Sequence, residues 1–295
     1  MKTLIELLKE NKILISDGAW GTFLQSKGLQ PGECPELWNI THRDVVFEIA
    51  KSYVDAGADM ILTNSFGANP IKLKHYGLES KTAELNFAAA SISREAAGDN
   101  HYVLGSIGPT GILLMMGEIS EDEIYEGFKI QATALKAGGA DAILIETMSD
   151  IDEAKLAVKA AKENTNLTVI CTFTFEKTLT GEYRTMMGVS PTEMTIALKE
   201  AGVDIIGTNC GNGFDQMIEI VQEIRTVDNS IPILVHANAG KPIFKDGITV
   251  FPETPDFMAS KVQLLIESGA NIIGGCCGTT PAHISAIANV VRNIK

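Results

Sequence analysis

Apolar and polar positions along the chain follow two alternating patterns. Short runs of β-branched and other apolar residues, typical of buried strands, alternate with amphipathic stretches that are long enough for helices. The pattern predicts strands at residues 13–16, 102–106, 168–175 and 232–237. Further strands are predicted within four repeated segments, so the chain should contain about eight strands in all.

The four repeated segments share one pattern of residues. In each, a helical pattern ends at a glycine suited to a left-handed C-cap, and an apolar run begins two residues later. The segments are residues 55–64, 136–147, 200–209 and 267–276. Helix starts are marked as well, by the capping boxes Ser120–Glu123 and Ser190–Glu193 and by prolines at first-turn positions. The elements therefore alternate strand, helix, strand.

This alternation predicts an α/β fold with a parallel sheet covered by helices. About eight strand–helix units in 295 residues match a (β/α)₈ TIM barrel, and we expect one domain over residues 1–295. An open doubly wound sheet is the alternative. The absence of a G-x-G-x-x-G or G-K-[ST] phosphate loop after any predicted strand favours the barrel.

Composition narrows the class of protein. A formal net charge of −13 argues against nucleic-acid and anionic-membrane partners, which both require clustered Lys and Arg. Five cysteines without even spacing indicate reduced thiols and a cytoplasmic protein rather than a secreted disulfide scaffold. The N-terminal MKTLIELLKE is unlike a signal peptide, and no apolar run approaches the roughly 20 residues of a membrane helix. We expect a soluble protein.

Three cysteines stand directly after predicted strands. Cys210 lies in IIGTNCGNG, and Cys276 and Cys277 lie in IIGGCCGTT. A barrel would bring these strand ends together, and the glycines around the pair permit the irregular backbone that turns both sulfurs inward. Three thiolates suit Zn²⁺ and leave a fourth position for a substrate, which favours catalysis. The alternative is three buried cysteines that only fill space.

The remaining cysteines and histidines carry less information. Cys171 lies within an apolar strand and Cys34 in a long first loop, so both are interpreted as filler. No two of the five histidines show paired metal-ligand spacing. Only His236 falls near a predicted strand end, where we expect a core or supporting role rather than ligation.

Polar residues follow four other strands on the face where the metal should lie. We expect Asp17, Asn64, Glu146 and Asn238 to contact a substrate there. Asp17 and Glu146 would pair with an ammonium group, although strand-end acids can equally cap a helix or pair with a base. Asn238 follows the strand between those that carry the cysteines. Its amide oxygen could occupy the fourth metal position until substrate displaces it, or hydrogen-bond within its loop.

These residues resemble a known family. The segments DGAWGT, LTNSFGAN, GSIGPTG, IETMSDIDEA, IGTNCG and GGCCGTTPAHI are similar to those of the zinc-dependent homocysteine S-methyltransferases, over residues 13–290. Within the family they resemble the homocysteine-binding N-terminal module of cobalamin-dependent methionine synthases. The resemblance implies zinc on Cys210, Cys276 and Cys277, and homocysteine held through its amino-acid end by Asp17 and Glu146. Trp20 stands where the family often has a smaller or unbranched residue.

The expected reaction is methylation of homocysteine to methionine, with the substrate thiol activated as a zinc thiolate and no protein nucleophile. No D-x-H-x-x-G element of corrinoid-binding modules is present, so cobalamin, if used, would be carried by a separate corrinoid protein or by further methionine synthase modules. A sulfonium or betaine donor, or another thiol acceptor, is an alternative. A non-catalytic metal-binding or redox barrel with a vicinal Cys276–Cys277 disulfide is an alternative of another class.

Overall fold

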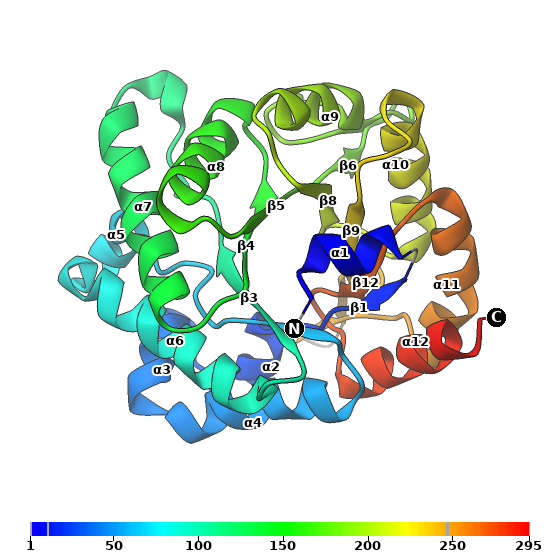
Figure 1. Cartoon of the computed structure of the whole chain (residues 1–295), viewed down its shortest axis with the longest axis horizontal. Helices are drawn as coiled ribbons and strands as arrows, with labels where there is room; N and C mark the ends of the chain where they lie inside the picture. The colour runs from blue at the N-terminus through cyan, green and yellow to red at the C-terminus, as the bar shows by residue number, and fades with distance from the viewer. Residues whose placement is uncertain (1, 11, 246–247, 295) are drawn as a thin grey trace.

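The chain folds into a nearly closed barrel of parallel strands. The computed structural model describes residues 2–10, 12–245 and 248–294. Within them, eight strands form one sheet in the spatial order β1-β12-β9-β8-β5-β4-β3-β2, and every neighbouring pair is parallel (Figure 1). The strands are β1 (Leu14–Ile15), β2 (Met60–Leu62), β3 (Tyr102–Ile107), β4 (Ala142–Met148), β5 (Thr168–Phe173), β8 (Ile205–Asn209), β9 (Ile233–Ala237) and β12 (Ile272–Gly275). The predicted (β/α)₈ fold is confirmed.

The seam between β1 and β2 is closed largely by side chains. Asp59 donates its backbone N–H to the Ile15 carbonyl over 2.7 Å, and its carboxylate accepts the Ile15 N–H, also over 2.7 Å. Nearer the carboxyl ends of the strands, Oδ2 of Asp17 accepts the N–H of Leu62 at 2.8 Å. Two aspartates therefore supply acceptors where the two shortest barrel strands leave backbone groups unpaired.

In the described part of the chain, eight helices surround the barrel, one after each strand. They are α4 (Arg43–Asp55), α6 (Thr82–Ala97), α7 (Glu121–Ala137), α8 (Ile151–Thr165), α9 (Pro191–Glu200), α10 (Phe214–Val227), α11 (Pro255–Ser268) and α12 (Pro281–Asn293). Both predicted capping boxes are present, at the starts of α7 and α9. The four repeated segments have the expected left-handed glycine, at Gly57, Gly139, Gly202 and Gly269, with φ between 74° and 113°.

Buried apolar side chains form two layers, as the alternation of strand residues requires. One layer fills the barrel interior and includes Leu14, Met60, Leu62, Leu104, Leu144, Ile170, Leu234 and Ile272. Leu4 and Leu8 of α1 (Leu4–Lys9) join it, so this short helix closes the N-terminal end of the barrel (Figure 1). The other layer lies between the strands and the outer helices. The barrel is thus packed below its mouth.

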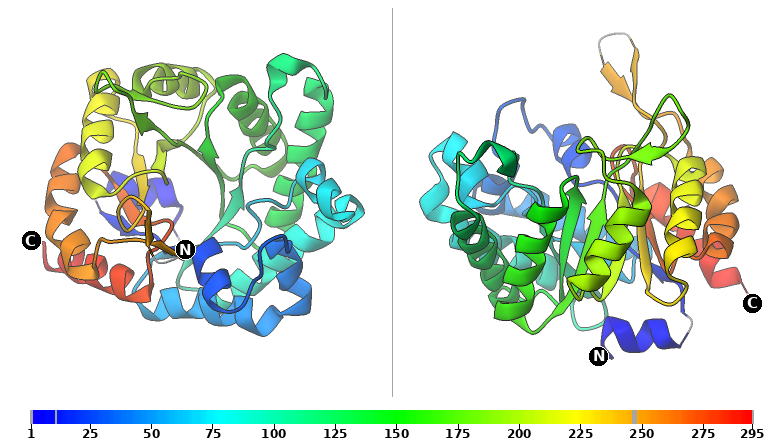
Figure 2. Two further views of the ribbon diagram at one scale, coloured as in Figure 1. Left: turned by 180° about the vertical axis from the view of Figure 1, so that it is seen from behind. Right: turned by 90° about the horizontal axis from the view of Figure 1, so that it is seen from above.

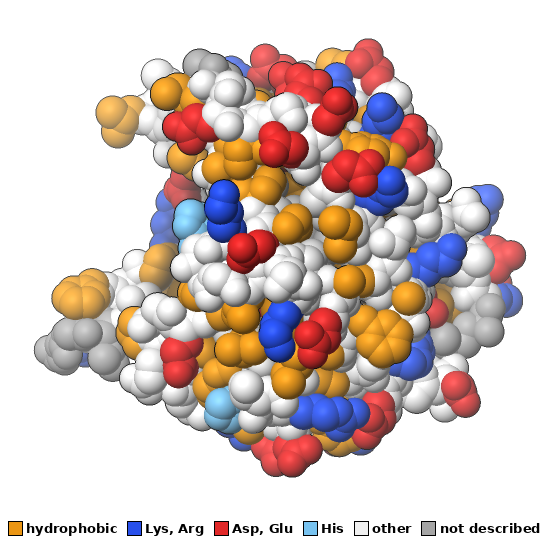
Figure 3. Space-filling model, turned by 90° about the vertical axis from the view of Figure 1, so that its left-hand side faces the viewer, with side chains coloured by type: hydrophobic (Ala, Val, Ile, Leu, Met, Phe, Trp, Pro, Cys, Tyr) orange, Lys and Arg blue, Asp and Glu red, His pale blue; other side chains and the backbone are white. Residues whose placement is uncertain are grey.

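The opposite end carries the longer loops (Figure 2). These loops include the short helices α2 (Gly21–Ser26), α3 (Trp38–Thr41) and α5 (Pro70–Leu73), the four 3₁₀ turns η1 (Pro35–Leu37), η2 (Lys74–Tyr76), η3 (Glu79–Lys81) and η4 (Leu114–Met116), and two hairpins. The hairpins are β6 (Glu176–Lys177) with β7 (Tyr183–Arg184) and β10 (Ile243–Lys245) with β11 (Ile248–Val250). In profile, projecting segments leave a hollow at this end of the molecule (Figure 3).

One predicted strand is shorter in the structure than in the prediction. The strand predicted over residues 168–175 ends at Phe173, because the chain turns into the β6–β7 hairpin there.

Among the described residues, no helix combines the length and the apolar character needed to span a membrane.

Candidate active site

Cys210, Cys276 and Cys277 meet at the mouth of the barrel. Each follows the end of its strand, and β9 lies between the two strands that carry them. The backbone of β9 fixes both segments, since Cys210 donates its N–H to the His236 carbonyl over 2.9 Å and Cys276 donates to the Ala237 carbonyl over 2.7 Å. Ligand atoms of the three cysteines lie within 4.8 Å of one another. Residues more than sixty positions apart thus form one sulfur cluster.

The cluster fits a tetrahedral metal ion. The Cys210 and Cys277 sulfurs lie 3.9 Å apart. Two sulfurs about 2.3 Å from one tetrahedral ion would lie about 3.8 Å apart, so little movement is needed for binding. Cys210 has a left-handed backbone with φ 61°, which is uncommon for a residue with a Cβ and turns its side chain out of the strand alternation. The backbone at the end of β8 therefore directs the Cys210 sulfur toward the other two cysteines.

Electrostatics also favour a cation here. Hydrogen bonds from the neighbouring thiols of Cys276 and Cys277 lower the pKa of the Cys210 thiol. Those same interactions with Cys210 raise the pKa of Cys276 and of Cys277. One thiolate therefore suppresses ionisation of its two neighbours, as expected for like charges in a shared site. A bound cation is what would allow all three sulfurs to ionise together.

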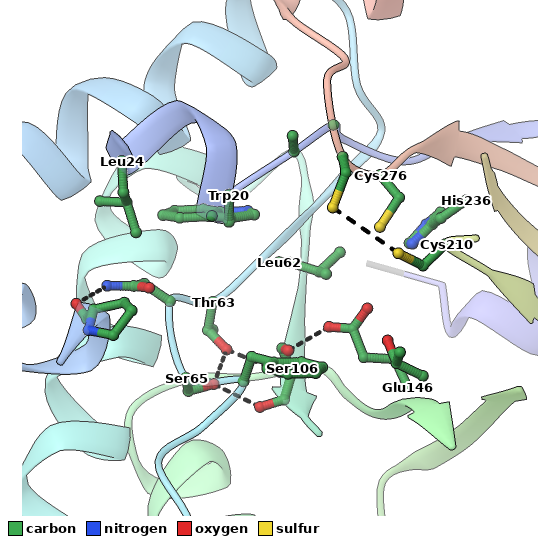
Figure 4. A pocket seen from close by; sticks show the side chains of 18 of the residues that line it. Trp20, Leu24, Leu62, Thr63, Ser65, Ser106, Glu146, Cys210, His236 and Cys276 are labelled. Carbon is green, nitrogen blue, oxygen red and sulfur yellow. Dashed lines mark hydrogen bonds between the residues drawn. The ribbon is translucent and has the colours of Figure 1, made fainter. Parts of the chain in front are cut away.

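The sulfur cluster forms one wall of a cavity of about 350 Å³. All three cysteines line it, and Trp20 and Leu24 lie across from them, with Glu146 below (Figure 4). The full lining also includes Gly18, Ala19, Gly21, Pro35, Glu36, Leu62, Thr63, Asn64, Ser65, Phe66, Ser106, Thr147, His236 and Gly275. The cavity is mainly apolar with a few convergent polar groups, which is typical of a small-molecule site.

Glu146 contributes a buried carboxyl group to this cavity. Its Oε1 accepts a hydrogen bond from the Ser106 hydroxyl, and its Oε2 lies 3.5 Å from Nδ2 of Asn209. Burial raises the pKa of Glu146 to about 7, and the charge of Asp17 adds to this shift against the hydrogen bond from Ser106. A cation that entered the cavity would reverse this effect by favouring the carboxylate.

Asp17 lies just behind the cavity lining rather than on it. Its Oδ2 accepts two hydrogen bonds, from Leu62 N–H at 2.8 Å and from the indole N–H of Trp20 at 2.9 Å. Burial raises the pKa of Asp17 to about 7, partly offset by these hydrogen bonds. The carboxyl group therefore closes the barrel seam and orients the Trp20 ring that forms the cavity wall.

Asn64 lines the cavity, but its side-chain amide is engaged with the first loop. Its Nδ2 donates to the Pro35 carbonyl at 2.8 Å and to Oδ1 of Asn39 at 3.1 Å. Asn39 returns a hydrogen bond to the Asn64 carbonyl at 2.8 Å. Asn64 thus holds residues 35–39 over the barrel mouth.

Asn238 and His236 lie beside the sulfur cluster on and after β9. The Asn238 side chain is buried and hydrogen-bonds Cys210, which helps to lower the pKa of that thiol, while its Oδ1 has no partner among the described residues. His236 faces the cavity, and burial lowers its pKa to about 3, so the ring is neutral. Its Nε2 also has no partner within the described part of the chain. Two buried polar atoms beside the sulfur cluster are thus left without a hydrogen-bond partner among the described residues.

Several cavity residues give little signal in the sequence. The strand predicted over residues 102–106 ends at Ser106, whereas β3 continues to Ile107, and only the fold shows that the Ser106 hydroxyl binds Glu146. Thr63 and Ser65 support Ser106 through a network of hydroxyl and backbone hydrogen bonds. Glu36 comes from the first loop and is 5% exposed. A loop residue can be assigned to a cavity only when the path of the loop is known.

Fold and site together define a (β/α)₈ barrel with a three-cysteine centre at its carboxyl end. The family model described as "Homocysteine S-methyltransferase" matches residues 14–291. The chain belongs to this family, as the resemblance in the sequence implies.

Two methionine synthases with similar sequences are longer than this chain. It is 34% identical to a methionine synthase of Mycobacterium tuberculosis over 99% of its own length, and 32% identical to one of Mycobacterium leprae over 98%. The chain spans only about a quarter of these relatives, 26% and 25% of their lengths.

Solved structures with the same fold include the metallated form of the homocysteine methyltransferase MmuM from Escherichia coli. The TM-score is 0.78 at 24% identity, with 96% of this chain and 98% of that chain covered. This likeness supports the barrel architecture.

Proposed function

We propose that this chain methylates the sulfur of homocysteine to give methionine, with residues 1–295 forming one homocysteine-binding barrel domain. The observation that carries the proposal is the three-sulfur cluster on the wall of a cavity that also presents the buried Glu146 carboxyl group. A thiol amino acid needs both features, one near its sulfur and one near its ammonium group. Family membership supports the same reaction.

Cys210, Cys276 and Cys277 are the residues proposed to hold Zn²⁺. The donor set supports zinc, since sulfur ligands suit this ion and three protein ligands leave one position for a substrate. When bound, zinc lowers the pKa of a thiol that reaches it and so supplies a thiolate near neutral pH. Asn238 and the neutral His236 lie beside this position, where the proposed role of Asn238 is to contact the substrate sulfur or the metal.

The chain itself binds and orients the amino acid. Glu146 is proposed to pair with the ammonium group, while Asp17 contributes negative charge from behind Trp20. Trp20 and Leu62 provide apolar walls for the methylene groups and exclude water. Asn64 is proposed to shape the same end of the cavity by holding the first loop.

Methyl transfer then requires no protein nucleophile. The substrate sulfur, already deprotonated, donates a lone pair to the methyl carbon as the bond from that carbon to the donor breaks, and the donor leaves with the bonding electrons. We propose a methylcorrinoid on another domain or protein as the donor, because the matched relatives are methionine synthases of which this chain covers a quarter. We expect this enzyme in the cytoplasm, since the five cysteines of the chain include a cluster that must stay reduced.

The test is methyl transfer by the purified, zinc-loaded protein. Homocysteine is incubated separately with methylcobalamin, S-methylmethionine and betaine, and methionine is measured. Methionine formation that Cys210→Ser abolishes and Cys171→Ala preserves supports the proposal, because Cys171 is buried within β5 away from the cluster. Methionine from a sulfonium or betaine donor alone overturns the corrinoid assignment. A zinc-loaded protein that forms no methionine with any donor contradicts the proposed reaction.

A further inference from the structure

Thr147 has an unusual backbone conformation beside the cavity. Its φ is 62°, in the left-handed region that β-branched residues rarely adopt. Thr147 is the next-to-last residue of β4, and the pairing of β4 with β5 shifts register between Ile145 and Met148. Glu146 and Thr147 therefore lie in an irregularity of the strand. A strained conformation of this kind persists only where its surroundings hold it.

Asn209 is the residue that holds Thr147. Its Oδ1 accepts the Thr147 N–H at 2.8 Å, and its Nδ2 donates to the Thr147 hydroxyl at 2.7 Å. The same side chain accepts from the Thr172 hydroxyl at 2.7 Å and lies 3.5 Å from Oε2 of Glu146. Asn209 is fully buried, so these contacts use both the acceptor and the donor groups of its amide.

The position of Asn209 links the two sides of the cavity. It ends β8 and directly precedes Cys210, and its side chain reaches across β5 to β4. Glu146 is thus fixed from two directions, by the Ser106 hydroxyl on one oxygen and by the Asn209–Thr147 contact on the other. No other side chain contacts both Thr147 and Glu146 among the hydrogen bonds of the described residues.

We propose that Asn209 is a positioning residue: by holding Thr147 in the left-handed conformation, it aims the Glu146 carboxyl group at the amino-acid end of the substrate. The kinetic part of this inference rests on the proposed function, whereas its structural part does not. A residue that only stabilised the fold would affect every substrate equally. A residue that aims Glu146 affects chiefly the recognition of the ammonium group.

The first test is therefore structural. A crystal structure of Asn209→Ala should show Thr147 returned to negative φ and the Glu146 carboxyl group turned away from its present position. If Thr147 keeps φ near its present value and Glu146 is unmoved, the proposal is overturned, whatever the protein catalyses. Failure of methyl transfer in the wild-type protein would instead affect only the proposed function.

The second test compares two acceptors, homocysteine and γ-mercaptobutyrate, which lacks the α-amino group. Asn209→Ala should raise KM for homocysteine by roughly 10-fold to 100-fold, the equivalent of losing one oriented hydrogen bond to a charged group, with a much smaller change in kcat. KM for γ-mercaptobutyrate should be nearly unchanged. Equal losses for both acceptors contradict the positioning role. Calorimetric binding of the two compounds gives the same comparison without turnover.

Two further variants separate positioning from folding. Thr165→Ala also removes a fully buried hydrogen-bonding side chain, at the carboxyl end of α8, where its hydroxyl binds the Ala161 carbonyl, and should leave the preference between the two acceptors unchanged. Thr147→Gly removes the conformational strain, because glycine accepts positive φ freely. The effect of Asn209→Ala on homocysteine should be smaller in the Thr147→Gly background than in the wild type. Additive effects in this double-mutant cycle would contradict the link between the two residues.

Discussion

Trp20 donates its indole N–H to Oδ2 of Asp17 over 2.9 Å, and this one oxygen also closes the barrel seam through the Leu62 N–H. A wall of the cavity is therefore tied to the backbone of the sheet. These two hydrogen bonds explain why the Asp17 carboxyl group lies behind the cavity lining instead of on it.

Trp20→Phe should weaken substrate binding with little loss of stability. The substitution keeps one aromatic ring but removes the hydrogen bond and part of the indole surface, so we expect a destabilisation of about 1 kcal/mol and a several-fold rise in KM for homocysteine. Denaturant unfolding and steady-state kinetics measure the two effects. Asp17→Ala is the matched comparison, because it also leaves the Leu62 N–H unpaired and should destabilise the protein by about 2 kcal/mol or more. Equal effects of the two changes would argue against the seam role of Asp17.

Metal binding should depend on all three cysteines of the cluster and on neither of the other two. Loss of a supporting residue typically lowers metal affinity by about 10-fold to 100-fold, so Cys210→Ser, Cys276→Ser and Cys277→Ser should each lower it by more than about 100-fold. Zinc retained after dialysis, measured per chain, reports the affinity. Cys34→Ser and Cys171→Ala should retain the ion. Zinc that survives Cys276→Ser at full stoichiometry would rule out the proposed ligand set.

Zinc should also stabilise the folded chain. An ion that binds only the native state raises the free energy of unfolding by about 2.7 kcal/mol when its free concentration is 100 times Kd. Titration of the reduced, metal-free protein with zinc should therefore raise its midpoint of unfolding, and the cysteine variants should lose this response. A midpoint that does not respond in the wild-type protein would contradict a site built in the folded barrel.

The sequence predicts the positions of strand ends well, but it predicts the contacts of individual side chains less well. Cys210 and Cys276 were placed by simple rules, because apolar runs mark the strands and parallel strands bring their carboxyl ends to one face. Ser106 and Asn209 escaped prediction for a physical reason. Ser106 is buried within a strand. Asn209 matters because it holds Thr147, on another strand, in a left-handed conformation, and nothing in the sequence around Thr147 predicts that conformation. Asp17 shows the converse, a recognisable residue whose contacts depend on how the barrel closes.

Glu146 should make the metal-free protein less stable as pH rises. The pKa of Glu146 in the folded chain is about 7, above its ordinary value of 4.5, because of burial. The native state therefore holds this proton more tightly than the unfolded state, and the free energy of unfolding falls as pH rises from about 4.5 to about 7 and changes no further above that window. At 1.36 kcal/mol per pKa unit, this contribution is at most about 3 kcal/mol.

Glu146→Gln isolates this contribution. Asp17 titrates in the same range because burial raises its pKa to about 7, so the comparison must be the difference between wild type and variant. The variant should be more stable than the wild type at pH 8 and should show a shallower pH dependence, measured by urea unfolding with a chelator and a reductant present. Parallel pH profiles for the two proteins would show that Glu146 keeps an ordinary pKa.

Gly207 should be intolerant of any side chain. It lies in β8 opposite Leu234 of β9, and a Cβ on Gly207 would lie 1.9 Å from the Leu234 carbonyl oxygen. Backbone on two packed strands cannot move aside without disturbing the segments that carry Cys210, so Gly207→Ala should destabilise the protein by several kcal/mol, about 3 or more, and weaken metal binding. Gly21→Ala is the control, since a Cβ there has no atom within 4 Å and the residue begins α2. Unfolding curves and zinc retention should therefore separate the two alanine variants, and a Gly207→Ala protein as stable as Gly21→Ala would mean that β8 and β9 do not pair in this register.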